Sequence, residues 1–203
     1  MFETICEVTP DCRPEVLEHT IQLAVEIARE GREGRKIGTI FVLGDEGATL
    51  KESHPLILDP LKGHPPDVKK VHDFNMRETV KELAQLDGAF ILSSEGVVIS
   101  AARFINADST GISLPLGLGA RHMAAAAVTR TTKSVAVVVS ESSIVRVFSK
   151  GHIVAEIIPE MWMLGRESIQ IEGPYKEAKI ADLQIFSCKL PKDEQKAKKD
   201  PHG

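Results

Sequence analysis

The chain has 203 residues, of which 42% are hydrophobic and 4% aromatic, and its formal net charge is -4 at pH 7. This length predicts one domain with short additions, and the apolar fraction is ordinary for a globular protein with a sizeable core. The acidic balance argues against a broad binder of phosphate backbones, and the single Trp and single Tyr argue against stacking platforms for single strands. We therefore expect no nucleic-acid partner, while a local basic pocket stays possible.

The longest apolar runs, such as residues 135–139, have the length of a β-strand. A membrane span needs roughly 18–20 apolar residues, so we expect no membrane partner. Residues 1–14 lack the basic-then-apolar order of a signal peptide. Cys6, Cys12 and Cys188 form no Cys-x-x-Cys pair, and their odd number disfavours a disulfide framework. The sequence therefore predicts a cytoplasmic chain with reduced thiols.

Apolar periodicity and turn residues predict the order α-β-α-β-β-α-β-β-β, beginning with a helix that has Pro14 in its first turn. In chain order, the expected elements are a helix over 14–32, a strand over 38–43, a turn at 45–47, an irregular proline-rich segment over 52–73, a helix over 76–86 capped by Asn75 and Glu78, a hairpin of strands over 88–93 and 97–101, a helix from 121, and strands over 134–140, 144–149 and 152–158. Helices interleaved with hairpins indicate an α/β fold with a mixed, twisted central sheet flanked by helices.

The predicted domain covers residues 14–158, after an N-terminal extension over 1–13. A C-terminal extension over 159–191 holds one further expected strand within 179–188, and its packing on the domain is left open. Residues 192–203 form a charged tail without apolar periodicity, which we expect to be disordered. His54, His64 and His72, in the irregular segment, match no metal-ligand spacing.

A glycine-rich segment, Gly-Leu-Gly-Ala-Arg-His-Met at 117–123, leads directly into the alanine-rich helix. Glycines before a helix let backbone amides approach a ligand, and the helix N-terminus adds partial positive charge. Arg121 and His122 in the first turn can add hydrogen bonds to phosphate oxygens. This pattern is typical of an anion site, although a plain glycine-rich connection with a solvent-facing arginine fits the spacing equally well. It is neither a Walker A loop nor a dinucleotide fingerprint.

Two acidic motifs stand at expected strand ends. Asp87, followed by Gly88 and Ala89, places a carboxylate at a helix-to-strand junction, where it suits a metal ligand or a proton acceptor. A turn-forming Asp-Gly explains the same residues. Ser140 and Glu141 follow another apolar strand and supply a second carboxylate, which a hairpin turn explains equally well.

Taken together, three segments resemble the diadenylate cyclase domain family in their order and approximate spacing. They are Asp-Gly-Ala-Phe-Ile-Leu at 87–92, Gly-Leu-Gly-Ala-Arg-His-Met-Ala-Ala-Ala at 117–126 and Val-Val-Val-Ser-Glu at 137–141. The first helix and the strand and turn at 38–45 also resemble the opening of that family, so the resemblance covers residues 14–158. It implies the fold of a soluble, nearly free-standing cyclase domain.

The resemblance implies that two ATP molecules are condensed into cyclic di-AMP with release of two pyrophosphates, using Mn²⁺ or Mg²⁺. Two protomers of a homo-oligomer, each holding one ATP, would face each other. Asp87, Arg121 and His122 would be catalytic, and Asp87 and Glu141 would bind the metal. The implied nucleotide-binding residues are Leu86, Gly88, Ala89, Gly119, Ala120, Arg121, His122, Ser140 and Glu141.

Two positions depart from the family pattern. Met123 stands where the family motif Arg-His-Arg has its second arginine, and Ala120 stands where many relatives carry threonine. Loss of one phosphate contact costs about 1.5–3 kcal/mol if nothing replaces it. The alternative hypothesis is therefore a nucleotide-binding or regulatory module that keeps the pocket without turnover, and a pure assembly scaffold has no positive support in the sequence.

Overall fold

A seven-stranded mixed sheet lies in the first of two units into which the chain divides, Met1–Pro159 and Glu160–Gly203. The computed structural model describes residues 6, 11–159, 175–180 and 183–188. The sheet order is β2-β4-β3-β1-β5-β6-β7. Its strands are β1 (Thr39–Leu43), β2 (Ser53–Pro55), β3 (Ala89–Leu92), β4 (Val98–Ile105), β5 (Val135–Val139), β6 (Val145–Ser149) and β7 (His152–Ile157). Only β1 and β3 pair in parallel, so the predicted mixed α/β sheet is confirmed.

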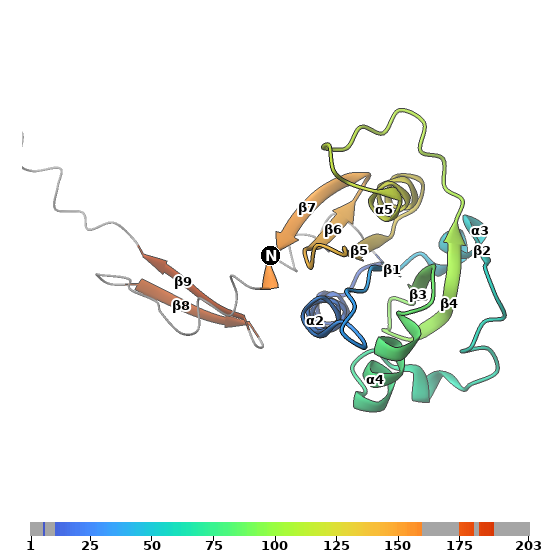
Figure 1. Cartoon of the computed structure of the whole chain (residues 1–203), viewed down its shortest axis with the longest axis horizontal. Coiled ribbons are helices and arrows are strands. Elements are labelled where there is room, and N and C mark those ends of the chain that lie inside the picture. Colours follow the sequence, from blue (N-terminus) through green and yellow to red (C-terminus); the bar gives the residue numbers. More distant parts are fainter. Residues whose placement is uncertain (1–5, 7–10, 160–174, 181–182, 189–203) are drawn as a thin grey trace, which may run out of the picture. The chain divides into compact units, whose positions relative to one another are not determined.

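Helices cover both faces of the central strands. The helices are α2 (Pro14–Glu30), α3 (Glu46–Lys51), α4 (Phe74–Leu83) and α5 (Ala120–Thr131), with a 3₁₀ helix η1 (Pro66–Lys69). Figure 1 shows α2 and α5 on opposite sides of β1 and β5. Side chains alternate along a strand, so Ile40 and Val42 of β1 pack with the small residues Ala125 and Ala126 of α5. These alanines let α5 lie close to the sheet.

Two short elements near the first strand differ from the sequence prediction. The expected turn at 45–47 is wrong, because α3 begins there directly after Asp45, which has a left-handed backbone (φ 43°). The segment expected to be irregular contains β2, which pairs antiparallel with the end of β4. Pro55 is tolerated in β2 because this strand lies at the edge of the sheet. Six-residue and three-residue elements are too short to produce a readable periodicity.

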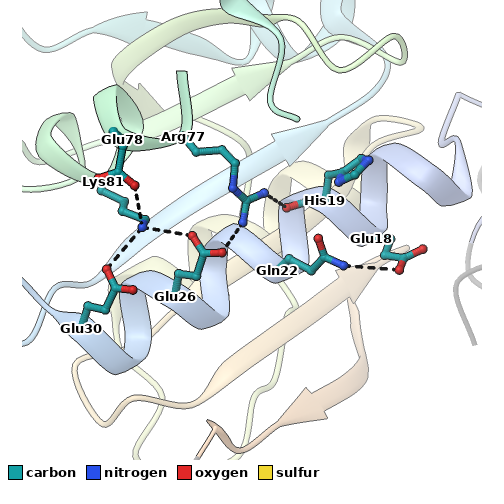
Figure 2. Close-up of polar contacts among 8 residues, drawn as sticks. All are labelled: Glu18, His19, Gln22, Glu26, Glu30, Arg77, Glu78 and Lys81. Atoms are coloured by element: carbon teal, nitrogen blue, oxygen red, sulfur yellow. Dashed lines mark hydrogen bonds and ion pairs between the residues drawn. The ribbon is translucent and has the colours of Figure 1, made fainter. Parts of the chain in front are cut away.

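Helix α4 begins at Phe74, two residues earlier than predicted. Asp73 is its N-cap and accepts a hydrogen bond from the Met76 amide at 3.0 Å, so the predicted cap at Asn75 is wrong. Glu78 binds Lys81 at 2.9 Å instead of closing a capping box. Lys81 and Arg77 reach across to carboxylates of α2, and this ionic network ties the two helices together (Figure 2).

The second unit contains a two-stranded antiparallel sheet of β8 (Tyr175–Ile180) and β9 (Leu183–Cys188). A hairpin therefore replaces the single strand predicted within 179–188. Trp162, Met163 and the predicted tail over 192–203 lie outside the described residues. Cys6 and Cys12 are free and buried. No helix in the described part of the chain combines the length and the apolar character needed to cross a bilayer.

Candidate functional site

The predicted site residues lie together at one end of the central strands, which is called the sheet edge below, and the strand pairing explains why. Ala89 at the start of β3 lies opposite Ile40 near the start of β1, because these strands run in parallel. Val139 at the end of β5 lies opposite Thr39, because β5 runs antiparallel to β1. Asp87 before β3 and Glu141 after β5 are therefore brought to the same edge, although 54 positions separate them in sequence.

Arg121 in the first turn of α5 links these two carboxylates. Its Nη1 donates to Glu141 Oε1 at 3.0 Å, and its Nη2 lies 3.9 Å from Asp87 Oδ1. The cluster is open, because the Arg121, Glu141 and Asp87 side chains are 36%, 68% and 83% exposed. Exposed ion pairs contribute little to stability, so these three groups are free to exchange one another for a ligand.

Two glycines give the cluster its space. A Cβ at Gly38 would lie 2.7 Å from Arg121 Nη1, so the guanidinium lies against the backbone at the start of β1. Gly88 has a φ of 105°, and a Cβ there would lie 2.7 Å from the Arg103 amide nitrogen of β4. Gly88 therefore allows β4 to approach the turn that carries Asp87, and the Asp87 carboxylate accepts from the Gly88 amide at 2.9 Å.

The first cavity beside the cluster has a volume of about 470 Å³ and a mainly apolar lining. Its wall consists of strand and helix side chains together with the loop after β4. The lining residues are Ile40, Leu56, Asp87, Gly88, Ala89, Arg103, Phe104, Ile105, Asn106, Ala107, Ser109, Ala120, Arg121, Met123, Ala124 and Ala127. Sequence reasoning missed the contribution of Phe104, whose exposed ring lies 5.3 Å from that of His54 between centroids. Met123 lines this apolar cavity.

The second cavity, of about 640 Å³, is formed by the glycine-rich segment and the loop after β5. Its lining residues are Asp87, Leu116, Gly117, Leu118, Gly119, Ala120, Arg121, His122, Ser140, Glu141, Ser142 and Arg146. Gly119 is the N-cap of α5 and supplies no side-chain cap; the His122 amide donates to the Gly119 carbonyl at 3.1 Å, which leaves the amides of Ala120 and Arg121 for a ligand. Met123 does not belong to this lining, although the motif comparison predicts a phosphate-facing position there.

Asp87, Ala120 and Arg121 line both cavities, so an apolar and a polar compartment meet at the ion cluster. A third cavity of about 220 Å³ also borders Asp87, Arg121 and Glu141. Leu86, predicted as a nucleotide contact, lines this third cavity and neither of the other two. The structure thus brings the other predicted residues together around the first two cavities, and their chemical roles stay predictions.

His122 is buried beneath the second cavity. Its Nε2 lies 3.2 Å from Nη1 of Arg146, a residue that sequence reasoning did not select. Burial, together with the charges of Arg146 and Arg121, lowers the pKa of His122 below its ordinary value, against a smaller opposing effect of Glu156. The imidazole is therefore neutral at physiological pH, and it can offer a ligand a hydrogen bond without adding charge.

The donor set at this edge suits a hard divalent cation that is shared with a substrate. Asp87 and Glu141 each place a carboxylate oxygen near a different terminal nitrogen of Arg121. Within the described residues, no group of three or more His, Cys, Asp or Glu side chains is arranged to hold a metal alone. Mg²⁺ is commonly bound by one or two carboxylates together with phosphate oxygens and water, so the residues present fit such an ion.

The loop over 106–119 lines both cavities, and the far end of α5 fastens it. Arg130 donates from Nη1 to the Thr110 carbonyl at 2.8 Å and from Nη2 to the Asp108 carbonyl at 2.7 Å. One helix therefore carries Arg121 and His122 at its beginning and holds the loop from its last turn.

The sequence matches one family model and is similar to two named relatives. The family model described as DAC, DisA bacterial checkpoint controller nucleotide-binding, matches residues 26–153. The chain is 47% identical over 160 residues to a diadenylate cyclase of Methanocaldococcus jannaschii and 38% identical over 151 residues to one of Haloferax volcanii. These matches cover 78% and 73% of this chain but 49% and 55% of the relatives, so the chain spans about half their length.

A solved structure of a hypothetical membrane spanning protein from Bacillus cereus has a similar fold, with a TM-score of 0.51 at 16% identity. That likeness covers 72% of this chain and 64% of the solved one, and at this identity it concerns the fold alone. The match of the family model to well over half of the chain is the stronger finding. Together with the motifs at the sheet edge, it establishes that this chain belongs to the diadenylate cyclase (DAC) domain family.

Proposed function

We propose that this chain condenses two ATP molecules into cyclic di-3′,5′-AMP and two pyrophosphates, with Mn²⁺ or Mg²⁺, between two facing protomers. The observation that carries the proposal is the meeting of an apolar and a glycine-rich polar cavity at Asp87 and Arg121. A purine suits the first cavity beside Phe104, and phosphates suit the amides and side chains of residues 117–122. The family membership and the names of the two archaeal relatives support the same reaction.

In each half-reaction, the 3′-oxygen of one ATP forms a bond to the α-phosphorus of the other. The bond from that phosphorus to the pyrophosphate oxygen breaks, and the hydroxyl proton passes to the exposed Asp87 carboxylate. Arg121 neutralises charge on the phosphates, and neutral His122 donates a hydrogen bond to them. A repeat of the step with the roles of the two nucleotides exchanged closes the ring.

Asp87 and Glu141 would hold the divalent cation, which supplies charge neutralisation at the phosphate oxygens when bound. Arg121 then serves as the group that keeps both carboxylates at the site before the substrate arrives. The Asp87 side chain is 83% exposed, which leaves its carboxylate accessible to a nucleotide held by a second protomer.

The first experiment incubates the purified chain with ATP and Mn²⁺ or Mg²⁺ and detects cyclic di-AMP by mass spectrometry. We expect product from the wild type and a loss of about 10²–10⁴-fold in Asp87→Asn, the range for removal of a general base. Because Asp87 is 83% exposed, this variant should unfold at the wild-type temperature. Bound ATP without product, across metals and protein concentrations, would favour the regulatory module instead.

The arrangement of two facing protomers has its own test. Specific activity should rise with protein concentration wherever association is limiting. When Asp87→Asn and Arg121→Met proteins are mixed, any recovered activity should come only from hybrid pairs that contain one protomer of each variant. A demonstrated monomer with full and concentration-independent turnover would contradict this part of the proposal.

A further inference from the structure

Three side chains, one each from α5, β6 and β7, form a chain of polar contacts that leads away from the second cavity. His122 of α5 contacts Arg146 of β6 at 3.2 Å, and the Nε of Arg146 donates to Glu156 of β7 at 2.5 Å. The strand register explains the second contact, because Arg146 and Glu156 are directly opposed in the β6–β7 ladder. The Arg146 side chain is only 11% exposed, whereas Glu156 reaches solvent.

Alternation along β6 also explains why Arg146 lies under the helix. Arg146 and Phe148 are two residues apart and therefore project from the same face of the strand. The Phe148 ring lies 6.1 Å from the His122 ring between centroids, at an interplanar angle of 54°. The His122 imidazole is thus held by an aromatic contact with Phe148 and a hydrogen bond with Arg146.

The contact with Arg146 determines the protonation of the imidazole. A guanidinium has donors and no acceptor, so Nε2 of His122 must accept and cannot carry a proton. In a neutral ring the proton then resides on Nδ1. Within the described residues no protein partner of Nδ1 is found, and His122 lines the cavity at the N-terminus of α5. The donor of His122 is therefore left for a ligand.

We propose that Arg146 is a positioning residue, which Glu156 holds in place and which fixes His122 as the tautomer that donates from Nδ1 to the substrate phosphates. This inference rests on the proposed function for its substrate, but the tautomer itself is a property of the free protein. It assigns a role in the site to a second arginine, on β6, in a chain whose third motif position is Met123.

The decisive experiment measures the His122 tautomer in the ligand-free protein at neutral pH by ¹⁵N–¹H correlation of the imidazole, with His122→Gln to assign the signal. We expect Nδ1–H in the wild type, and a shift toward Nε2–H in Arg146→Met, where the donor is lost. Arg146→Lys restores a donor and should recover part of the Nδ1–H population. An Nε2–H wild type, or an unchanged tautomer in Arg146→Met, would overturn the proposal.

Arg77→Met is the matched control, because Arg77 is 13% exposed and also pairs with a glutamate at 2.5 Å, but in the α2–α4 network. Both methionine variants should lose stability, and only Arg146→Met should change the tautomer. With ATP, turnover of Arg146→Met should fall about 10- to 100-fold, by analogy with the loss of a group that orients a metal-bound histidine. A changed tautomer with full turnover would refute the positioning role.

Failure of this proposal and failure of the proposed function give different results. If the wild type forms no cyclic di-AMP, the proposed reaction fails, whereas the tautomer of the ligand-free protein still decides whether Arg146 orients His122. Thermal unfolding of each variant, followed by circular dichroism, keeps loss of fold separate from both.

Discussion

Two ionic clusters of this protein use the same chemical groups in opposite ways. Between α2 and α4, Lys81 lies within 2.9–3.3 Å of Glu78, Glu26 and Glu30, and its side chain is 11% exposed (Figure 2). At the sheet edge, Arg121 has two carboxylate partners that are mostly in solvent. The first cluster surrounds its cation on several sides and ties two helices together. The second leaves its charges accessible, so that a metal ion and phosphates can replace the internal partners.

The sharpest way to break this comparison is to remove each cation in turn. Arg121→Met should lower turnover about 10²–10³-fold, as expected when an electrostatic contact to the reacting phosphate is lost. Its stability should change by no more than about 0.5 kcal/mol, because the pairs it makes are exposed. Steady-state kinetics and urea unfolding measure the two effects. A large loss of stability would mean that the site cluster is structural as well.

Lys81→Met should give the reverse result. We expect a loss of about 1–3 kcal/mol in the free energy of unfolding, since charged hydrogen bonds disappear while the remaining glutamates stay partly hydrated. Turnover per folded molecule should stay at the wild-type level. Lys150→Met, at an exposed position in a turn, is the control for removal of one charge. Unfolding at the wild-type urea concentration would show that the network contributes nothing measurable.

The pH dependence of stability should separate the two clusters more finely. Burial alone would lower the pKa of Lys81, but the hydrogen bonds that Lys81 donates to Glu78 and Glu26, together with the negative charges of Glu26 and Glu30, outweigh it, so the pKa is raised. The hydrogen bond from Lys81 lowers the pKa of Glu78. The stabilisation that depends on charged Lys81 is therefore complete below about pH 10.4, the pKa of an unperturbed lysine, and is lost as the pH rises through its raised pKa in the folded protein. The stabilisation that depends on charged Glu78 is complete above about pH 4.3, the pKa of an unperturbed glutamate, and is lost as the pH falls through its lowered pKa in the folded protein.

Urea unfolding of wild type and Lys81→Met over this range checks the prediction. The difference in unfolding free energy between them should be flat near neutrality and shrink at both extremes. The corresponding difference for Arg121→Met should stay near zero throughout. A Lys81 difference that is constant at all pH values would contradict the ionic origin of the stabilisation.

The smallest expected effect concerns Met123. Since this side chain lines the apolar cavity, Met123→Arg should raise the KM for ATP a few-fold by placing a charge there, without increasing kcat. Met123→Leu keeps the apolar character and should remain close to wild type. A clear gain of turnover in Met123→Arg would mean that position 123 faces the phosphates after all.

Local sequence patterns predict the long elements well. The helix expected over 14–32 is α2 over 14–30, and the strand expected over 38–43 is β1 over 39–43. These segments succeed because burial repeats with the period of the element over several turns or pleats. The cap of α4 was predicted wrongly because Asp73 and Asn75 are both good capping residues, and local sequence does not decide between them.

The candidate site was predicted in part for a different reason. Local patterns marked Asp87, Arg121 and Glu141 as candidates, but they left open a turn for each carboxylate and a plain glycine-rich connection for Arg121, so their combination into one site came from the motif resemblance. The sequence analysis did not select Arg146 and Phe104, because their places beside the cavities follow from strand register and from the helix or loop that covers them. From the local sequence Val-Arg-Val-Phe, Arg146 is expected to face solvent. Its side chain is mostly buried because α5 lies over β6.

Arg130 joins the 106–119 loop to the last turn of α5, so the loop is linked through this helix to Arg121 and His122 in its first turn. A helix of this length is about 18 Å long, so a displacement at one end is transmitted to the other with little bending. Movement of the loop should therefore affect Arg121 and His122 at the opposite end of the helix.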